Sequence, residues 1–369
     1  MDNAKFKMND DDTRYTRQIR LKGFGPAAQD KLKAASVLVV GAGGLGIPVL
    51  QYMVGMGIGR IVIADGDRIS VSNLQRQVLY STPEVGQLKA EVAAKKLAEL
   101  NPLVKIEWYP WMLTPENALS LIEAVDLVVD ATDNFASRYL INDACVIAGK
   151  PFIYGAVQQY EGQLSVFNYQ GGPTYRCLYP EQPSPGEVPD CNEAGVLGIV
   201  PGIVGSLQAL EAVKVITGIG RTLSGSLKIV DFLSGNEYKV RLKASPENQN
   251  IDRLQDSYEF ACQTVNDLSP QNLHEWYLEG KKFLLVDVRE TFEYESGHLM
   301  HAFSVPLAQL STFEMELPAN VPLVTFCQMG GRSLKAAEIL QQRKNTKVYN
   351  LRGGMESWMS HFNNEFIEF

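Results

Sequence analysis

The feature that most constrains the fold is an alternation, between residues 37 and 154, of short β-branched runs with longer segments of helical spacing. The candidate strands are Val37–Val40, Arg60–Ala64, Val104–Trp108, Leu127–Asp130 and Phe152–Tyr154. Strands that alternate with helices in this way are typical of a parallel sheet covered by helices. The first part of the chain is therefore predicted to be an α/β domain of Rossmann-like type.

Three later runs predict that the sheet continues with antiparallel strands. They are Leu164–Phe167, Leu227–Phe232 and Glu237–Leu242, and a helix is expected from about Gly202 to Thr217 between the first and second of them. The sheet is therefore expected to be mixed.

The pattern fails at residues Lys243–Phe260, which are polar and lack periodicity, as is typical of a linker. A second, smaller α/β unit follows. We predict domains at residues 1–243 and 264–369, joined by a linker at 244–263.

Composition excludes several classes of protein. Of 369 residues, 45% are hydrophobic and 21% charged, which is ordinary for a soluble globular protein. The net charge of −8 and the lack of dense basic runs argue against nucleic-acid binding. Residues Met1–Thr13 lack an apolar signal core, so no export signal is expected. The most apolar stretch, Ile199–Gly220, contains Gln208, Glu211 and Lys214 and predicts a buried helix rather than a membrane span.

The cysteines indicate a reducing compartment. Five of them are widely spaced along the chain, an odd number that does not form a disulfide framework. We therefore expect a cytoplasmic protein.

A glycine-rich turn follows the first candidate strand. Gly41, Gly43, Gly44 and Gly46 lie between that strand and a helix, where glycines allow a phosphate to approach the helix N–H groups. Asp65 ends the next strand, where a carboxylate can accept hydrogen bonds from ribose hydroxyls. This pattern fits NAD as well as ATP, and taken alone it favours an NAD-dependent oxidoreductase.

The residues that follow change this interpretation. Asp67, Asn73, Arg76 and Lys89 come next, and cleaving a triphosphate requires cations spread along it. Arg76 and Lys89 can supply that charge. The alternative for each is a solvated charge on a loop or a helix face.

A carboxylate is also placed where a metal would be needed. Asp133 lies just beyond the strand Leu127–Asp130, at the carboxyl edge of the sheet, and suits Mg²⁺ bound with ATP. The alternative is that Asp133 caps the helix expected at Phe135–Ala148, although Asp130 or Asn134 could do the same.

Residues from about Arg14 to Leu242 resemble the MoeB/ThiF family of adenylyltransferases, relatives of ubiquitin-activating enzymes. The motifs that carry the resemblance are Arg14–Gln18, Gly41–Gly46, Asp65–Asp67, Ser72–Gln77, Lys89, Ala131–Asn134, Cys191 and Glu193–Val196. The resemblance implies that the chain adenylates the C-terminal glycine of a ubiquitin-like sulfur carrier of the MoaD/ThiS type.

The resemblance also implies roles for individual residues. Gly44 and Asp65 contact the nucleotide, and Asp133 places the magnesium. Asn73, Arg76 and Lys89 hold the triphosphate. Arg17 reaches the triphosphate in the neighbouring subunit of a homodimer.

In the second unit, Cys327 joins a strand-like run, Val321–Phe326, to a helix-like run, Ser333–Gln342. A thiol at a helix N-terminus is exposed to N–H groups and to the positive end of the helix dipole, both of which favour the thiolate. Gly330 and Gly331 let the loop curl around the sulfur.

Together with Asp287–Glu290, Glu293, Gly297 and His298, this loop resembles the rhodanese domain of sulfurtransferases, which hold a persulfide on the loop cysteine. Cysteine-based phosphatases share the architecture, but their longer loop suits a phosphate. Two alternatives stay open: a buried structural cysteine, and a domain that only recruits a separate sulfur donor.

The remaining cysteines carry two further expectations. Cys191 lies on an expected loop, where it could accept the acyl group or form a bridge to the carrier, or be an ordinary loop residue. Many family members bind zinc through two CxxC pairs. Here only Cys177 and Cys262 remain, with Glu259 in a partner position, so we expect no zinc.

The sequence therefore predicts an ATP- and Mg²⁺-dependent adenylyltransferase fused to a rhodanese-like domain. Its expected partners are a sulfur carrier with a C-terminal Gly-Gly, a second copy of the chain and an upstream sulfur donor, with no nucleic acid or membrane. The thiocarboxylate product could serve molybdopterin, thiamine or tRNA thiolation.

Overall fold

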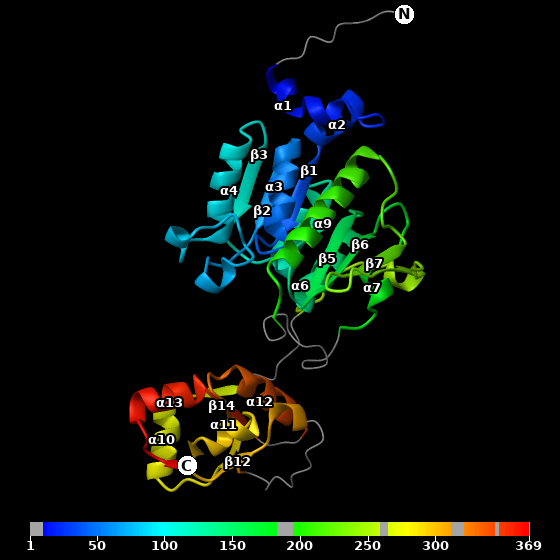
Figure 1. Ribbon diagram of the computed structural model, residues 1–369. Coiled ribbons are helices and arrows are strands. Elements are labelled where there is room, and N and C mark those ends of the chain that lie inside the picture. Colours follow the sequence, from blue (N-terminus) through cyan, green and yellow to red (C-terminus); the bar gives the residue numbers. More distant parts are fainter. Residues whose placement is uncertain (1–9, 183–194, 259–264, 311–320, 344–346, 369) are drawn as a thin grey trace, which may run out of the picture. The chain divides into compact units, whose positions relative to one another are not determined.

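The computed structural model describes residues 10–182, 195–258, 265–310, 321–343 and 347–368 (Figure 1). These residues form two compact units, the first ending at Tyr258 and the second following it. The domain limits drawn from the sequence stay a prediction. Each unit is described by itself.

The first unit contains an eight-stranded mixed sheet in the order β3-β2-β1-β4-β5-β6-β7-β8. The first five strands, which are parallel, are β1 (Ser36–Val40), β2 (Arg60–Ala64), β3 (Lys105–Tyr109), β4 (Leu127–Asp130) and β5 (Phe152–Gln158). The antiparallel strands are β6 (Glu161–Phe167), β7 (Ser226–Asp231) and β8 (Glu237–Arg241). The predicted mixed sheet is confirmed.

Helices cover both faces of this sheet because its strands alternate their apolar side chains between two cores. Val37 and Val39 of β1 lie in one core, and Leu38 and Val40 in the other. The helices on the first face are α3 (Gly46–Met56), α4 (Lys89–Leu100) and α9 (Ile199–Thr217) (Figure 1). Those on the second are α5 (Pro115–Glu123), α6 (Phe135–Ile147) and α7 (Tyr175–Leu178).

Helix α9 is long and apolar enough to cross a membrane, but its packing shows another role. It contacts α3, β5 and β6, and Val204 and Val213 lie in the core. The buried Gln208 Nε2 donates a hydrogen bond of 2.6 Å to the carbonyl of Asp130. It is therefore the core helix that the sequence predicts.

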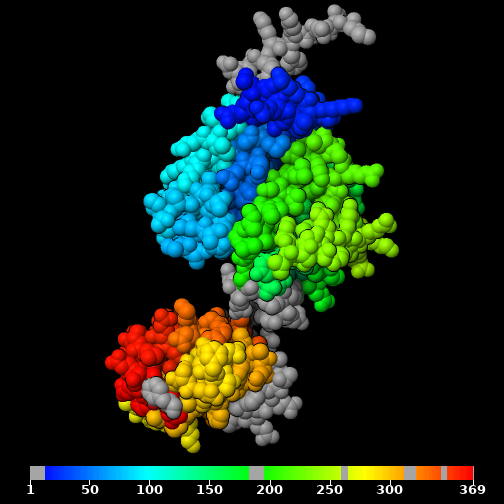
Figure 2. Space-filling model, viewed as in Figure 1, coloured from blue at the N-terminus to red at the C-terminus, as the bar shows by residue number. Residues whose placement is uncertain are grey.

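Two helices before the sheet lie at one end of the first unit, shown in dark blue in Figure 2. They are α1 (Asp10–Ile19) and α2 (Gly25–Ala34). The buried hydroxyl of Tyr15 in α1 accepts a hydrogen bond of 2.8 Å from Asn101 Nδ2, which ties α1 to the end of α4.

The second unit has a five-stranded parallel sheet in the order β12-β10-β13-β14-β9. Its strands are β9 (Asn266–Leu268), β10 (Leu284–Asp287), β12 (Ala302–Ser304), β13 (Leu323–Phe326) and β14 (Val348–Leu351). Its helices are α10 (Pro270–Leu278), α11 (Thr291–Glu295), α12 (Gly331–Arg343) and α13 (Gly354–Phe362). A separate antiparallel pair joins β11 (His298–Leu299) to β15 (Ile367–Glu368).

Residues 245–258, within the segment expected to be a linker, lie along the first unit. Asn248 Nδ2 donates to the carbonyl of Arg176 over 3.0 Å, and Gln249 Nε2 donates to the carbonyl of Gly172 over 3.0 Å. Tyr258 is buried, and its hydroxyl donates to Asp143 Oδ2 over 2.7 Å. Asn248, Gln249 and Tyr258 of this segment therefore have fixed partners on the domain that precedes it.

Candidate active sites

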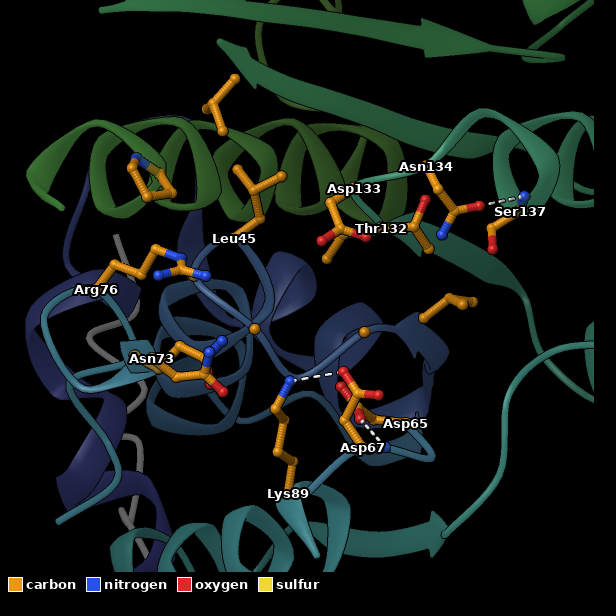
Figure 3. Close-up of a pocket in the computed structure, with 18 of the residues that line it drawn as sticks. Leu45, Asp65, Asp67, Asn73, Arg76, Lys89, Thr132, Asp133, Asn134 and Ser137 are labelled. Atoms are coloured by element: carbon orange, nitrogen blue, oxygen red, sulfur yellow. Dashed lines mark hydrogen bonds and ion pairs between the residues drawn. The ribbon is translucent and has the colours of Figure 1, made fainter. Parts of the chain in front are cut away.

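A cavity of about 760 Å³ opens beyond the carboxyl ends of β1, β2 and β4 (Figure 3). Ligands of open α/β sheets bind at this edge, where the strand order reverses. The predicted site residues that line it are Gly41, Gly43, Gly44, Asp65, Asp67, Asn73, Arg76, Lys89 and Asp133. Residues from separate loops are therefore brought together as the sequence predicts, whereas their individual roles stay predictions.

The glycine turn has two kinds of glycine. Gly41 has a φ of 97°, and a Cβ there would lie 2.7 Å from the carbonyl oxygen of Ala131. A Cβ on Gly46 would collide with the carbonyl of Gly41. By contrast, a Cβ on Gly43 would meet only Gln77 Nε2, at 3.5 Å. Gly41 and Gly46 thus shape the turn, while Gly43 lines the open cavity.

Asp65 braces this turn. Its Oδ2 accepts the N–H of Ala42 over 2.7 Å, and its Oδ1 accepts the N–H of Asp67 over 2.8 Å. Burial raises the pKa of the Asp65 carboxyl, and the charge of Lys89 and the N–H of Ala42 oppose that rise. The carboxylate therefore has a structural role in addition to the predicted contact with ribose.

The two predicted cations lie on the cavity wall in different surroundings. Lys89 Nζ forms an ion pair of 2.8 Å with Asp67 Oδ2, and the lysine side chain is only 8% exposed. An ammonium has three donors, so this pair orients Lys89 while leaving two N–H groups for other acceptors. Arg76 Nη1 donates to the carbonyl of Ser72 over 3.0 Å, which directs the guanidinium along the cavity (Figure 3).

Asp133 is not the cap of helix α6. Asn134 is the N-cap residue, because its Oδ1 accepts the N–H of Ser137 over 2.9 Å. The hydroxyl of Thr132 donates a hydrogen bond of 2.6 Å to Asp130 Oδ1. The capping alternative is therefore wrong for Asp133, whose exposed carboxylate lies across the cavity from Lys89 (Figure 3).

The structure adds residues that the sequence analysis missed. The buried Tyr80 hydroxyl donates to the carbonyl of Ala42 over 2.9 Å and so holds the glycine turn. Burial raises the pKa of Tyr80, which keeps the hydroxyl protonated. Gln77 is buried on the cavity wall, and its Oε1 has no partner among the described residues. Gln77 is the last residue of the family motif Ser72–Gln77, so that motif could have indicated it. No sequence pattern singles out Tyr80.

Among the described residues predicted for the nucleotide site, Gly46 and Arg17 do not line the cavity. Arg17 is exposed on α1 and does not line the cavity of its own chain. Cys191 lies outside the described residues.

A second site lies in the second unit, around Cys327. The predicted order of strand, loop and helix is confirmed, since Cys327 follows β13 and α12 begins at Gly331. Cys327 is 2% exposed, and its Sγ accepts the N–H of Gly330 over 3.1 Å. Gly330 has a φ of 95°, which turns that N–H toward the sulfur.

Helix α13 holds the outer side of this loop. The N–H of Met355 donates to the carbonyl of Cys327 over 2.9 Å, and the N–H of Glu356 donates to the carbonyl of Gln328 over 3.0 Å. A Cβ on Gly354 would collide with the Cys327 carbonyl. Helix α13 therefore binds two carbonyls of the loop, while the N–H of Gly330 binds the sulfur from within it.

Arginines on both sides of the loop are neutralised by carboxylates. Arg332 forms a bidentate pair with Glu293, with N–O distances of 2.7 and 2.8 Å, and this pair lowers the pKa of Glu293 to about 2. Arg289 is buried and pairs with the buried Asp287 over 2.7 Å. The loop therefore has a rigid frame of two ion pairs.

The expectation of no zinc site stays a prediction. Cys177 Sγ accepts the N–H groups of Thr174, at 3.4 Å, and Ser245, at 3.3 Å. Within the described residues, no group of three or more His, Cys, Asp or Glu side chains is placed to hold a metal. Cys262 and Glu259 lie outside the described residues.

Comparisons with known proteins agree with the two-part organisation of the chain. The model of the ThiF family matches residues 15–252, and that of the rhodanese-like domain matches residues 269–361. Over 238 residues, 63% of this chain, it is 54% identical to the sulfur carrier protein adenylyltransferase of Thermus thermophilus, of which it covers 88%. It is 39% identical to the adenylyltransferase and sulfurtransferase MOCS3 of Anopheles gambiae, covering 96% of this chain and 88% of that protein.

Among solved structures, Escherichia coli MccB with ATP superposes with a TM-score of 0.56, covering 64% of this chain and 73% of that one. At 24% identity this similarity shows the fold alone. The fold defines a two-part α/β protein, with a cavity at the carboxyl edge of the first sheet and a buried cysteine in the loop before α12 of the second unit. The chain belongs to the ThiF family and carries a C-terminal rhodanese-like domain. It is an adenylyltransferase and sulfurtransferase that uses ATP, which removes the oxidoreductase alternative.

Proposed function

We propose that this enzyme adenylates the C-terminal glycine of a ubiquitin-like sulfur carrier and then replaces AMP with sulfur from Cys327. The main observation in support is the cavity, where an open glycine turn, two cations and an exposed carboxylate face one another. The name of the Thermus thermophilus relative supports a sulfur carrier as the substrate.

The first reaction brings a carboxylate toward the α-phosphate of ATP, so two anions must approach each other. Arg76 and Lys89 lower that repulsion, and Asp67 keeps Lys89 pointed into the cavity. The attacking carboxylate is already ionised, so no general base is needed. The exposed carboxylate of Asp133 fits magnesium, which would add positive charge at the phosphates.

In the second reaction, the outer sulfur of a Cys327 persulfide attacks the acyl carbon and AMP leaves. This forms a C–S bond and joins the carrier to Cys327 as an acyl disulfide. A thiol must then break the S–S bond, which releases the thiocarboxylate and leaves a disulfide on the enzyme. Cys191 is our candidate for that thiol. An upstream donor reloads Cys327, and a reducing cytoplasm would restore the thiols.

We also propose a homodimer with shared sites. Tyr15 anchors α1, while Arg17 on the same helix is exposed and could reach a neighbouring cavity. Tyr52 of α3 and Ile203 and Leu210 of α9 are exposed apolar residues, 57%, 37% and 48% accessible, as expected where a second copy packs.

Mixing two inactive variants tests this sharing. Arg17→Ala and Asp133→Ala subunits should together regain pyrophosphate exchange, because one site of each mixed dimer has both residues. No recovery, despite verified subunit exchange, would remove Arg17 from the neighbouring site.

The substrate is tested by ATP–pyrophosphate exchange. Exchange should appear only with a carrier that has a free C-terminal Gly-Gly, because the attacking carboxylate belongs to the partner. The matched control is the same carrier without its last glycine. Exchange without any carrier would contradict the proposed substrate.

Metal analysis of the same preparation should find far less than one zinc per chain.

A further inference from the structure

The hydroxyl of Tyr80 lies between two stretches of backbone at the nucleotide cavity. It donates to the carbonyl oxygen of Ala42 in the glycine turn over 2.9 Å, and it is 3.2 Å from the carbonyl oxygen of Lys89, the first residue of α4. Tyr80 is buried, and its ring belongs to the core on the face of the sheet that α3 and α4 cover. The hydroxyl therefore ties the glycine turn to the helix that carries the lysine of the cavity wall.

The backbone of Tyr80 is itself held in place. Lys96 of α4 donates from Nζ to the carbonyl of Leu79 over 2.7 Å, and the N–H of Tyr80 donates to the carbonyl of Gln77 over 3.1 Å. Tyr80 is therefore a fixed point against which the glycine turn is held.

This contact determines the direction of a neighbouring N–H group. The C=O and the N–H of a trans peptide unit point in opposite directions, and the described residues include no cis peptide bond. Because the C=O of Ala42 points at the buried Tyr80, the N–H of Gly43 points away from it, toward the cavity that Gly43 lines. Asp65 holds the preceding peptide unit by accepting the N–H of Ala42 over 2.7 Å.

The N–H of Gly43 is placed to bind an anion. No backbone carbonyl of the described residues accepts it. Helix α3 begins three residues later, at Gly46, and the positive end of its dipole favours negative charge at this turn. In the proposed function, the anion in this cavity is the triphosphate of ATP.

We propose that Tyr80 is a positioning residue for adenylation, whose hydroxyl fixes the peptide unit between Ala42 and Gly43 so that the N–H of Gly43 donates to a phosphate oxygen of ATP. Burial raises the pKa of Tyr80, so the hydroxyl keeps the proton that the Ala42 carbonyl accepts. The inference rests on the proposed function in taking this cavity as the site of adenylation.

The test is the binding of ATP and of adenosine to the full-length protein, with magnesium chloride and without a carrier. Tyr80→Phe keeps the ring and removes the hydroxyl, so the peptide unit is free to rotate. By calorimetry we expect the affinity for ATP to fall about five- to thirtyfold, as for a lost hydrogen bond to a charged group. The affinity for adenosine, measured by competition with ATP, should stay within about twofold of wild type because adenosine has no phosphate.

Pyrophosphate exchange gives a second measurement on the same variant. The Gly43 N–H contacts phosphate both before and during the reaction, so its loss weakens binding of the substrate and of the transition state alike. The KM for ATP should rise by the factor seen in calorimetry, while kcat stays within about threefold of wild type.

Tyr139→Phe is the matched control. Tyr139 is also buried in the first unit, and its hydroxyl donates to the carbonyls of Tyr179 and Glu181, at 3.0 and 2.6 Å. It does not line the cavity. This variant should lower the melting temperature to a similar extent, because it too leaves carbonyls without their donor, and it should bind ATP as wild type does.

A third measurement uses the wild-type protein labelled with ¹⁵N-glycine. The amide signal of Gly43, assigned by its loss in Gly43→Ala, should move to lower field when ATP is added, as for an N–H that gains an anionic acceptor.

Wild-type affinity for ATP in folded Tyr80→Phe protein overturns the proposal, and so does an equal loss of adenosine binding or an equal loss in Tyr139→Phe. An unmoved Gly43 signal in the presence of saturating ATP also overturns it. Binding of ATP needs neither a carrier nor sulfur. Failure of this inference is therefore distinguishable from failure of the proposed function, which is read by carrier-dependent exchange and thiocarboxylate formation.

Discussion

The nucleotide cavity and the Cys327 loop bind anions in different ways. The cavity collects side chains from loops after three strands, and its charged residues lie on opposite walls of an open space (Figure 3). The Cys327 loop is one short segment in which Cys327 is 2% exposed. Its sulfur accepts hydrogen bonds from the N–H of Gly330 and the hydroxyl of Ser333, and backbone N–H groups of α13 bind the loop carbonyls. The cavity thus suits a long polyanion such as a triphosphate, which side chains from several loops would contact. The Cys327 loop suits a single sulfur atom, which is held mainly by the conformation of the backbone.

This difference predicts how each site responds to change. In the cavity, removing a charged side chain removes transition-state stabilisation while the fold is kept. At the loop, backbone geometry matters most, so a methyl group added at the wrong glycine alters both stability and function. The two sites should therefore be separable by mutation, because each unit has its own hydrophobic core.

The largest expected effect is the loss of sulfur transfer in Cys327→Ala. Thiocarboxylate formation from thiosulfate should stop because no persulfide can form, while pyrophosphate exchange stays at the wild-type level. Sulfide added to the mixture should bypass the defect by attacking the adenylate directly. Mass spectrometry of the carrier measures the product.

Cys177→Ala is the control, since it removes a half-buried thiol from the other unit. Undiminished thiosulfate-dependent transfer in Cys327→Ala would leave the second unit as a domain that recruits a separate sulfur donor.

Asp133→Ala should have the next largest effect. In contrast to Cys327→Ala, it should impair pyrophosphate exchange and leave the Cys327 loop unaffected. We expect pyrophosphate exchange to fall about 10²- to 10³-fold, as for the loss of one group that stabilises charge in a transition state. Alkylation of Cys327 should be unchanged.

The matched control is Asn134→Ala, which removes the cap of α6. It should lower the free energy of unfolding by about 1 kcal/mol and leave exchange close to wild type. Equal loss of exchange in both variants would mean that Asp133 acts through the helix end.

The strands were predictable because their sequence pattern is local. Leu127–Asp130 and Arg60–Ala64 have the predicted bounds, since short β-branched runs between helices have no competing structure. The glycine turn was also predictable, because the positive φ of Gly41 and the close approach at Gly46 exclude other residues.

Contacts between distant segments could not be predicted in the same way. Tyr80 binds the carbonyl of Ala42, and Asn350 joins Ser333 to Asp267, but none of these pairs has a characteristic spacing. The polar composition of residues 243–260 indicates a linker, but composition alone does not show whether such a segment is solvated or hydrogen-bonded to a neighbouring surface. Tyr258 is hydrogen-bonded to Asp143 of the first unit, so this part of the segment is bound to a surface.

A smaller effect is expected for Gly354→Ala, which tests whether the Cys327 loop depends on backbone geometry. Gly354 has a φ of 55°, and its Cβ would collide with the carbonyl of Cys327. Thermal or urea unfolding should show the second unit destabilised by about 1 to 3 kcal/mol, with exchange in the first unit unchanged.

Gly331→Ala is the matched control, since a Cβ there would have no neighbour within 4 Å. Its free energy of unfolding should stay within about 0.5 kcal/mol of wild type. Equal destabilisation in both variants would show that the loop tolerates no side chain at all, whatever the backbone geometry.

The smallest effect concerns the ion pair that frames the loop. Arg332 lowers the pKa of Glu293 from its ordinary value of 4.5 to about 2, so the folded state favours the ionised form. The resulting stability is fully present above pH 4.5 and is lost as the pH falls through about 2. Urea unfolding should therefore find wild type more stable than Glu293→Gln at pH 7, with the difference shrinking below pH 4.5. Glu295→Gln, an exposed change on the same helix, should show no such trend. A difference that persists unchanged to about pH 2 would mean that Glu293 acts through packing, and that the loop depends on backbone geometry without support from this charge pair.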